Sequence, residues 1–222
     1  MISLKEIEKA KHIVILTDNT SFCNASALYT FILRLHKKVS LSSQDTLDKK
    51  YAFLPWFEKS RTVSPSGADL EIRVGNESLL DFFLTHEQKI NQKMALALYA
   101  GLLEKMYSLQ NTRLNGMFFA RMGELLELGA NHEICIHYLY KCEPLSLYRL
   151  KAKMFANMLL REEAQESCFV LSQEDLIATG CSLEDAFVIM EESLKIAHVK
   201  QAILIDEKNK LIKKIEDTHF GI

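Results

Sequence analysis

A polar turn separates an apolar run at residues 12–17 from a helical pattern at 25–36, and it holds the side chains best suited to chemistry. The turn consists of Asp18, Asn19, Thr20 and Ser21. Together with the backbone N–H groups at the start of the helix, these side chains could hold a phosphate or a carboxylate. A helix cap and turn without a ligand explains the same residues, and we favour that interpretation. Residues 19–28 contain no carboxylate, so the turn offers too few ligands for a divalent metal.

The other reactive side chains do not form a recognisable site. Four residues have the chemistry of zinc ligands, namely His132, Cys135, His137 and Cys142. Their spacing does not place three of them on one helical face, so packing roles are expected. Cys23 and Ser26 have no base or orienting acid that the sequence identifies, and we expect structural roles for both. Lys105 could line a shallow basic cleft with Arg113 and Arg121, although a solvated face explains these residues equally well.

The composition is that of a globular protein with an ordinary core. The chain has 222 residues, of which 48% are hydrophobic and 25% charged, and its formal net charge is −2. This length allows one large domain or two small ones. The basic and acidic residues are balanced, which is not typical of a protein that binds the backbone of nucleic acids. Five scattered cysteines without a CxxC motif indicate reduced thiols. With no signal peptide and no apolar run long enough for a bilayer, we expect a cytoplasmic protein that does not bind membranes.

Alternating elements in the first third predict a strand, a helix and a second strand. Residues 12–17 are typical of a strand buried on both faces, 25–36 of a helix, and 39–41 of another strand, which together predict a βαβ unit. Residues 69–74 alternate polar and apolar side chains, so they predict an edge strand with one exposed face.

Helices are expected to dominate the middle of the chain, and a mixed structure to follow. Helical patterns cover residues 93–107, 114–128 and 132–141, and a longer helix is expected from Pro144 to about Glu163. Gly129 is typical of a left-handed helix cap. Residues 167–171 predict a strand, 172–175 and 182–185 are helix-start signatures, and 201–205 with 211–215 predict a hairpin. The expected domains are 1–128, an α/β domain; 129–163, a helical connector; and 164–222, a small α+β portion.

Three stretches resemble the DHH/DHHA1 phosphoesterase superfamily, which includes RecJ-like nucleases, oligoribonucleases and nucleotide phosphatases. Residues 98–103 and 124–130 resemble two successive helices of that family, the first of which carries a metal-binding aspartate. Residues 171–185 resemble the opening of the DHHA1 domain. The resemblance implies an α/β fold: a DHH-like N-terminal domain with a mainly parallel sheet and flanking helices, a helical middle and a partial DHHA1-like α+β portion. It also implies chemistry with paired Mn²⁺ or Mg²⁺ ions.

The sequence departs from this family at the positions that would bind metal. Aligned on residues 25–27, the first-motif histidine and two aspartates of the family fall on Leu16, Thr20 and Phe22. Another expected aspartate falls on Lys105, and a further one near Gly75, where Asn76 and Glu77 are approximate substitutes. No Asp-His-His triplet occurs, and the glycine-rich GGGH loop is absent. Two-metal catalysis needs several carboxylates and imidazoles, so we expect a degenerate, truncated member whose metal site is lost.

These departures favour a non-catalytic bacterial protein that binds a protein partner or a nucleotide, without a cofactor. The residues expected to bind a ligand are Asp18, Asn19, Thr20, Ser21 and Lys105. The first alternative is a divergent Mn- or Mg-dependent phosphodiesterase or phosphatase acting on short oligonucleotides or nucleotides. It requires rebuilt ligands to converge within roughly 5 Å, drawn from Asp18, Asp69, Glu77, Asp81, His86 and Glu104. The second alternative is a homodimer formed through a sheet edge after Ile215.

Overall fold

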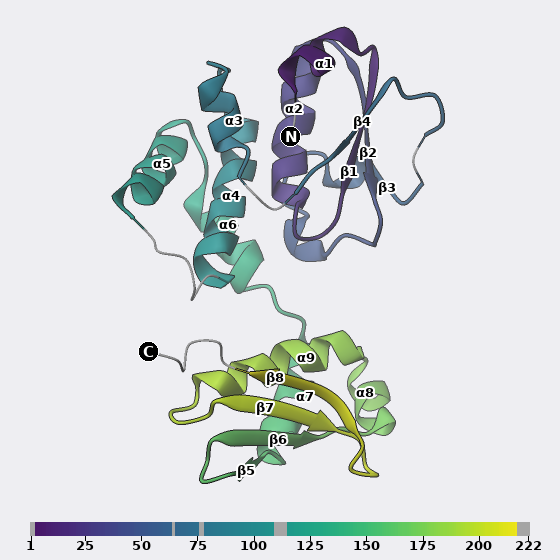
Figure 1. Ribbon diagram of the computed structural model, residues 1–222, viewed down its shortest axis with the longest axis vertical. Helices are drawn as coiled ribbons and strands as arrows, with labels where there is room; N and C mark the ends of the chain where they lie inside the picture. The colour runs from purple at the N-terminus through teal and green to yellow at the C-terminus, as the bar shows by residue number, and fades with distance from the viewer. Residues whose placement is uncertain (1–2, 64, 76–77, 109–114, 217–222) are drawn as a thin grey trace. The chain divides into compact units, whose positions relative to one another are not determined.

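The computed structural model describes residues 3–63, 65–75, 78–108 and 115–216, with residues 107 and 108 in backbone only. The chain forms two compact units, Met1–Cys142 and Glu143–Ile222. Figure 1 shows a layered α/β arrangement in the first unit and a sheet with packed helices in the second. The segment 129–163, expected to be a helical connector, contributes helices to both units. None of the helices in the described ranges is long and apolar enough to cross a membrane.

The first unit is built on a four-stranded parallel sheet with the order β3-β2-β1-β4. Its strands are β1 (His12–Thr17), β2 (Lys38–Ser43), β3 (Ser60–Arg61) and β4 (Leu70–Arg73). The apolar run of β1 is almost wholly buried at the centre of the sheet, as its sequence predicts. β4 lies at the sheet edge with Ile72 buried and Arg73 exposed, which confirms the alternating pattern of residues 69–74.

Helices cover this sheet and supply most of the core. They are α1 (Leu4–Lys9), α2 (Phe22–Arg34), α3 (Leu80–Thr85), α4 (Gln92–Ser108), α5 (Gly116–Glu127) and α6 (His132–Tyr140), with short 3-10 turns at Lys49–Tyr51 and Phe57–Lys59. α2 joins the parallel strands β1 and β2, so the expected βαβ unit is present. α4 packs closely against α2, since a Cβ added at Gly101 would lie 3.1 Å from the Cβ of Cys23. Gly129 has a φ of +92° after α5, which confirms the predicted left-handed cap.

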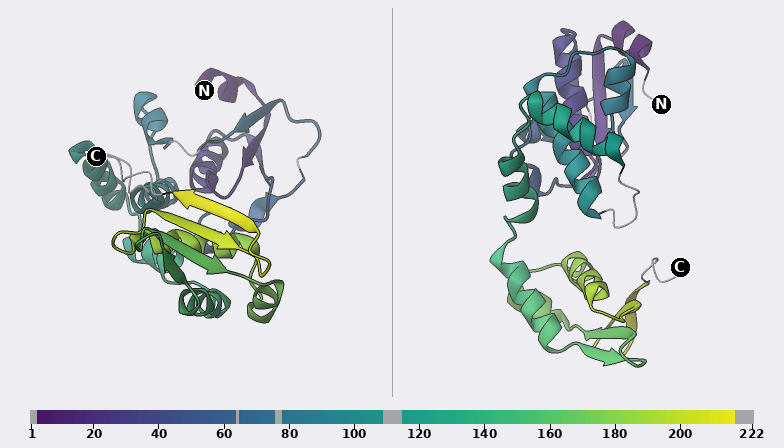
Figure 2. Two further views of the ribbon diagram at one scale, coloured as in Figure 1. Left: turned by 60° about the horizontal axis from the view of Figure 1, so that its bottom comes forward. Right: turned by 90° about the vertical axis from the view of Figure 1, so that its left-hand side faces the viewer.

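The second unit combines a mixed sheet with three helices. Its elements are α7 (Leu145–Ala156), β5 (Leu159–Arg161), β6 (Glu166–Val170), α8 (Gln173–Thr179), α9 (Leu183–Glu192), a 3-10 turn at Ser193–Lys195, β7 (Gln201–Ile205) and β8 (Leu211–Glu216). The sheet order is β5-β6-β7-β8, and only β6 and β7 are parallel. α7 and α9 pack on each other and against the central strands (Figure 2). The predicted hairpin and both helix-start signatures are confirmed, the latter as capping boxes at Ser172 and Ser182.

The expectation of one helix from Pro144 to about Glu163 was wrong. α7 ends at Ala156, and residues 159–161 form β5, paired antiparallel with β6. Glu162 and Glu163 adopt φ values of +51° and +56° in the turn between these strands. Ladder hydrogen bonds to β6 therefore override the helix propensity of this Leu- and Glu-rich stretch. At the opposite edge lies β8, the strand at which pairing with a second copy remains a prediction.

Candidate functional site

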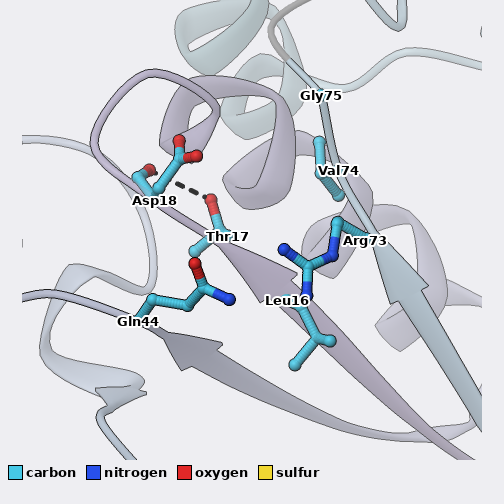
Figure 3. A pocket seen from close by; sticks show the side chains of 7 residues that line it. All are labelled: Leu16, Thr17, Asp18, Gln44, Arg73, Val74 and Gly75. Carbon is cyan, nitrogen blue, oxygen red and sulfur yellow. Dashed lines mark hydrogen bonds between the residues drawn. The ribbon is translucent and has the colours of Figure 1, made fainter.

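A pocket lies where the parallel strands of the first sheet end. It has a volume of about 380 Å³, and its lining comes from the ends of β1, β2 and β4 and the residues that follow them. Figure 3 shows the lining residues Leu16, Thr17, Asp18, Gln44, Arg73, Val74 and Gly75. The carboxyl edge of a parallel sheet is the usual ligand-binding position in α/β folds, and the volume suits a small molecule.

Asp18 is the one carboxylate among the described residues of this lining, and its hydrogen bonds are made within its own turn. Its Oδ1 accepts bonds from the Thr20 hydroxyl (2.8 Å), the Ser21 N–H (2.9 Å) and the Ser21 hydroxyl (2.8 Å). In return the Asp18 N–H donates to the Ser21 Oγ over 3.1 Å. Burial acts to raise the pKa of Asp18, but these hydrogen bonds outweigh it, and the pKa lies below its usual value. Asp18 and Ser21 thus form reciprocal hydrogen bonds within the turn that precedes α2.

The remaining residues of the polar turn lie outside the lining of the pocket. Asn19 ties the turn to the segment after β2, since its Oδ1 accepts from the Asp48 N–H (2.7 Å) and its Nδ2 donates to the Thr46 carbonyl (3.4 Å). Thr20 and Ser21 bond to Asp18 as described. These bonds lie within the turn or join it to the segment after β2, and the N-cap of α2, Ser21, makes no side-chain capping bond to the helix. Ligand binding by Asn19, Thr20 and Ser21 remains a prediction.

Arg73 supplies the positive charge of the pocket. It is the last residue of β4, in parallel register with Leu16 of β1, and its side chain is exposed. Figure 3 shows its guanidinium turned into the pocket toward the amide of Gln44. Within the described residues no carboxylate forms an ion pair with Arg73. The sequence alone did not indicate Arg73 or Gln44 as site residues. The available signal was an arginine at the end of an alternating strand, directly before Val74 and Gly75.

The positions that align with metal ligands of the family that the sequence resembles are scattered through the first unit. Leu16 and Gly75 reach the pocket. Phe22 is fully buried, with its ring centroid 5.7 Å from that of Tyr51. Lys105 lies half-buried on α4 and is not part of the pocket lining. Asn76 and Glu77 lie outside the described residues.

The donor set does not fit a two-metal centre. No group of three His, Cys, Asp or Glu side chains within the described ranges is placed to hold a metal ion. Asp69 accepts bonds from the Lys11 and His12 N–H groups, at the start of β1 and thus at the opposite end from the pocket. Asp81 forms an ion pair with Arg121, and His86 bonds through Nδ1 to the Phe82 carbonyl. The described members of the rebuilt-ligand set therefore do not converge.

Glu104 is the centre of a second polar cluster, between α2, α4 and the turn after β2. Its carboxylate accepts from the Tyr51 hydroxyl (2.8 Å), pairs with Lys50 Nζ (2.9 Å) and lies 3.5 Å from the Cys23 Sγ. Burial, with the nearby carboxylate, raises the pKa of Cys23 well above its usual value and that of Tyr51 likewise. The Cys23 thiol is therefore held protonated and is a poor nucleophile. We call Cys23, Lys50, Tyr51 and Glu104 the Glu104 cluster.

The other candidates from the sequence have separate surroundings. Ser26 is fully buried and donates to the Pro55 carbonyl over 2.7 Å, which fits a structural role. The four zinc-like residues do not form one site: His132 bonds to the Tyr99 hydroxyl, Cys135 is buried, and His137 contacts Cys142. Of the basic trio, Arg121 is paired with Asp81, and Arg113 lies outside the described residues.

Comparison with solved structures establishes the class of fold. The chain matches the crystal structure of an exopolyphosphatase-related protein from Bacteroides fragilis with a TM-score of 0.74 and 15% sequence identity, over 93% of this chain and 79% of that chain. The α/β fold with a parallel sheet, flanking helices and a second sheet, expected from the sequence, is confirmed.

A second alignment is weaker. A putative family II inorganic pyrophosphatase from Methanococcus jannaschii aligns over 88% of this chain and 83% of its own length, with 11% identity and a TM-score of 0.33. No family model and no curated protein matches the sequence.

Proposed function

We propose that this phosphoesterase-like fold binds a small phosphate-bearing ligand, such as a nucleotide, at the carboxyl edge of the first sheet, and does not hydrolyse it with metal ions. The observation that carries the proposal is the charge of the pocket. Among the residues that the structure describes, its lining holds one guanidinium, Arg73, and one carboxylate, Asp18, whose Oδ1 already accepts three hydrogen bonds.

The chemistry of Arg73 suits a phosphate better than a metal. A guanidinium is always charged and presents a planar set of donors that can bind two phosphate oxygens at once. The Gln44 amide lines the same space and can add a hydrogen bond to a phosphate. The buried Thr17 hydroxyl already bonds to the Asp18 carbonyl (3.2 Å) and the Ser21 Oγ (3.0 Å). A dication would instead meet a fixed positive charge and too few oxygen ligands.

The size of the pocket favours a small ligand over the protein partner that the sequence also allowed. A cavity of about 380 Å³ lies in the range of small-molecule sites. The similar structure from Bacteroides fragilis is described as exopolyphosphatase-related, so phosphate-bearing molecules are the first ligands to test.

The test is a thermal-shift screen of the full chain with inorganic phosphate, polyphosphate and nucleoside mono-, di- and triphosphates, each with Mn²⁺ or with EDTA. We expect at least one compound to raise the Tm equally under both conditions, because a ligand that binds the folded state stabilises it by about 2.7 kcal/mol at one hundred times its Kd. Arg73→Gln should abolish the shift. Arg61→Gln is the matched control, since Arg61 is exposed on β3 of the same sheet and outside the pocket lining.

Two outcomes would contradict the proposal. Release of phosphate or nucleotide that requires Mn²⁺ and stops with EDTA would support the divergent hydrolase instead. An unchanged Tm with every compound would exclude the phosphate-binding pocket, whatever the activity.

A further inference from the structure

A cysteine and a histidine form an exposed pair at the end of α6. The Cys142 Sγ lies 3.1 Å from the His137 Nε2, and both side chains are exposed. The other four cysteines differ: Cys23, Cys135 and Cys168 are buried, and Cys181 is half-buried. Cys142 thus combines access to solvent with contact to an imidazole nitrogen, the arrangement in which a histidine can serve as base for a thiol.

The position of His137 supports its role as the proton acceptor. It lies in the last turn of α6, where its own carbonyl accepts from the Lys141 N–H over 3.0 Å. The partial negative charge at a helix C-terminus stabilises a positive imidazole ring once the ring has taken up the proton. The Tyr138 ring packs edge-on against the His137 ring, with centroids 5.3 Å apart.

The charged groups nearest to the pair along the chain have mixed signs. Glu133 lies one turn earlier on α6, and Lys141 and Glu143 flank Cys142. All three are exposed, and no ion pair between any of them and His137 is formed in the described part of the chain. The 3-10 turn Lys49–Tyr51 also packs against α6, and its Lys50 pairs with Glu104. Cys142 and His137 are in direct contact over 3.1 Å.

We propose that Cys142 is a modification site that exchanges with small-molecule disulfides, with His137 as the base. The Cys142 thiol gives its proton to His137 Nε2 while its sulfur attacks one sulfur of the disulfide, and the S–S bond breaks. A new Cys142–S–S–R bond forms, and the leaving thiolate takes the proton back from the imidazolium. Overall, one protein thiol and one disulfide give one mixed disulfide and one free thiol, and no other oxidant is needed.

The experiment follows the reaction of the full chain with 5,5′-dithiobis(2-nitrobenzoate), an aromatic disulfide whose released thiol is coloured. We expect a fast phase of one thiol that disappears in Cys142→Ser. His137→Gln should slow this phase by about tenfold or more at pH 7, because a positioned base contributes at least this much. The effect should shrink at pH 9, where hydroxide competes with the protein base for the thiol proton. Glutathione disulfide should modify the peptide containing Cys142, as mass spectrometry would detect.

Glu127→Gln is the control, since it neutralises an exposed carboxylate on a different helix of the same unit, α5, and should leave the fast phase unchanged. The proposal would be overturned by a fast phase that survives in Cys142→Ser. It would also be overturned by equal slowing in the His137 variant at both pH values, which would indicate altered access alone, or by no mixed disulfide with glutathione.

Discussion

The pocket at the sheet edge and the Glu104 cluster are two polar regions of the first unit, and the charged groups in them have opposite surroundings. In the cluster, a half-buried carboxylate meets an ammonium, a phenol and a thiol of the same chain. In the pocket, the guanidinium of Arg73 faces an open cavity without an ion pair to any described carboxylate. The cluster is closed by the protein itself, whereas the pocket leaves its charge available for a ligand.

From this difference we expect the Glu104 cluster to contribute to the stability of the first unit and the pocket to contribute to ligand binding. A charged group that is removed from a satisfied, partly buried network leaves its partners unpaired, which lowers the free energy of unfolding. A charged group that points into an open cavity has no protein partner to lose. The single tryptophan, Trp56, lies in the first unit and can report on its unfolding separately from the second unit.

The largest effect is expected for Glu104→Ala. The change leaves Lys50 and the Tyr51 hydroxyl without their acceptor, and it should lower the free energy of unfolding of the first unit by about 2 kcal/mol. Urea titration followed by Trp56 fluorescence would measure it. Glu124→Ala on the exposed face of α5 is the control and should have little effect. Equal loss in both variants would show that the cluster contributes nothing beyond helix propensity.

Tyr51→Phe should cost about 1 kcal/mol at neutral pH, because only one hydrogen bond to Glu104 is lost while the buried ring remains. Burial, with the charge of Glu104, raises the folded-state pKa of Tyr51 above the value of about 10 for an exposed tyrosine. Its contribution is therefore full below pH 10 and is lost as the pH rises beyond it. Urea titrations at pH 7 and pH 10.5 should show a smaller difference between wild type and Tyr51→Phe at the higher pH. Tyr148→Phe, at an exposed position, serves as the control.

Asp18→Ala should lower the free energy of unfolding by about 1 kcal/mol at pH 7, because the hydrogen bonds from Thr20 and Ser21 to its carboxylate are lost. Because the folded-state pKa of Asp18 lies below its usual value, the contribution of its charge is present above the unfolded pKa of about 3.9. This contribution is lost as the pH falls through the folded pKa. From pH 7 downward, the difference between wild type and variant should therefore stay constant to about pH 4 and become smaller as the pH falls further. Asp45→Ala, an exposed neighbour of the pocket, should give a constant difference over the same range.

Local patterns were sufficient to predict much of the fold. The apolar run of β1, the alternation in β4, the capping boxes at Ser172 and Ser182 and the hairpin of β7 and β8 all depend on residues close in sequence. The end of α7 was mispredicted because β5 exists only through its pairing with β6, a contact that helix propensity does not report.

The site was harder to predict, because its members come from three strands. The sequence identified Asp18, which follows an obvious strand. Arg73 and Gln44 join it only through the parallel register of β1 with β4 and β2, which sequence spacing does not fix. The Glu104 cluster likewise joins residues 23, 51 and 104, which share no local motif.

The smallest effect on stability is expected for Arg73→Gln, and this variant tests the comparison most directly. Since Arg73 forms no ion pair with a described residue, the free energy of unfolding should change by less than about 0.5 kcal/mol in the absence of ligand. The added stability that a bound phosphate compound gives the wild type should disappear in the variant. Urea titration by Trp56 fluorescence, with and without the compound, measures both quantities. If Arg73→Gln without ligand lowered the free energy of unfolding as much as Glu104→Ala, Arg73 would contribute to the stability of the fold. The pocket and the Glu104 cluster would then differ only in their exposure to solvent.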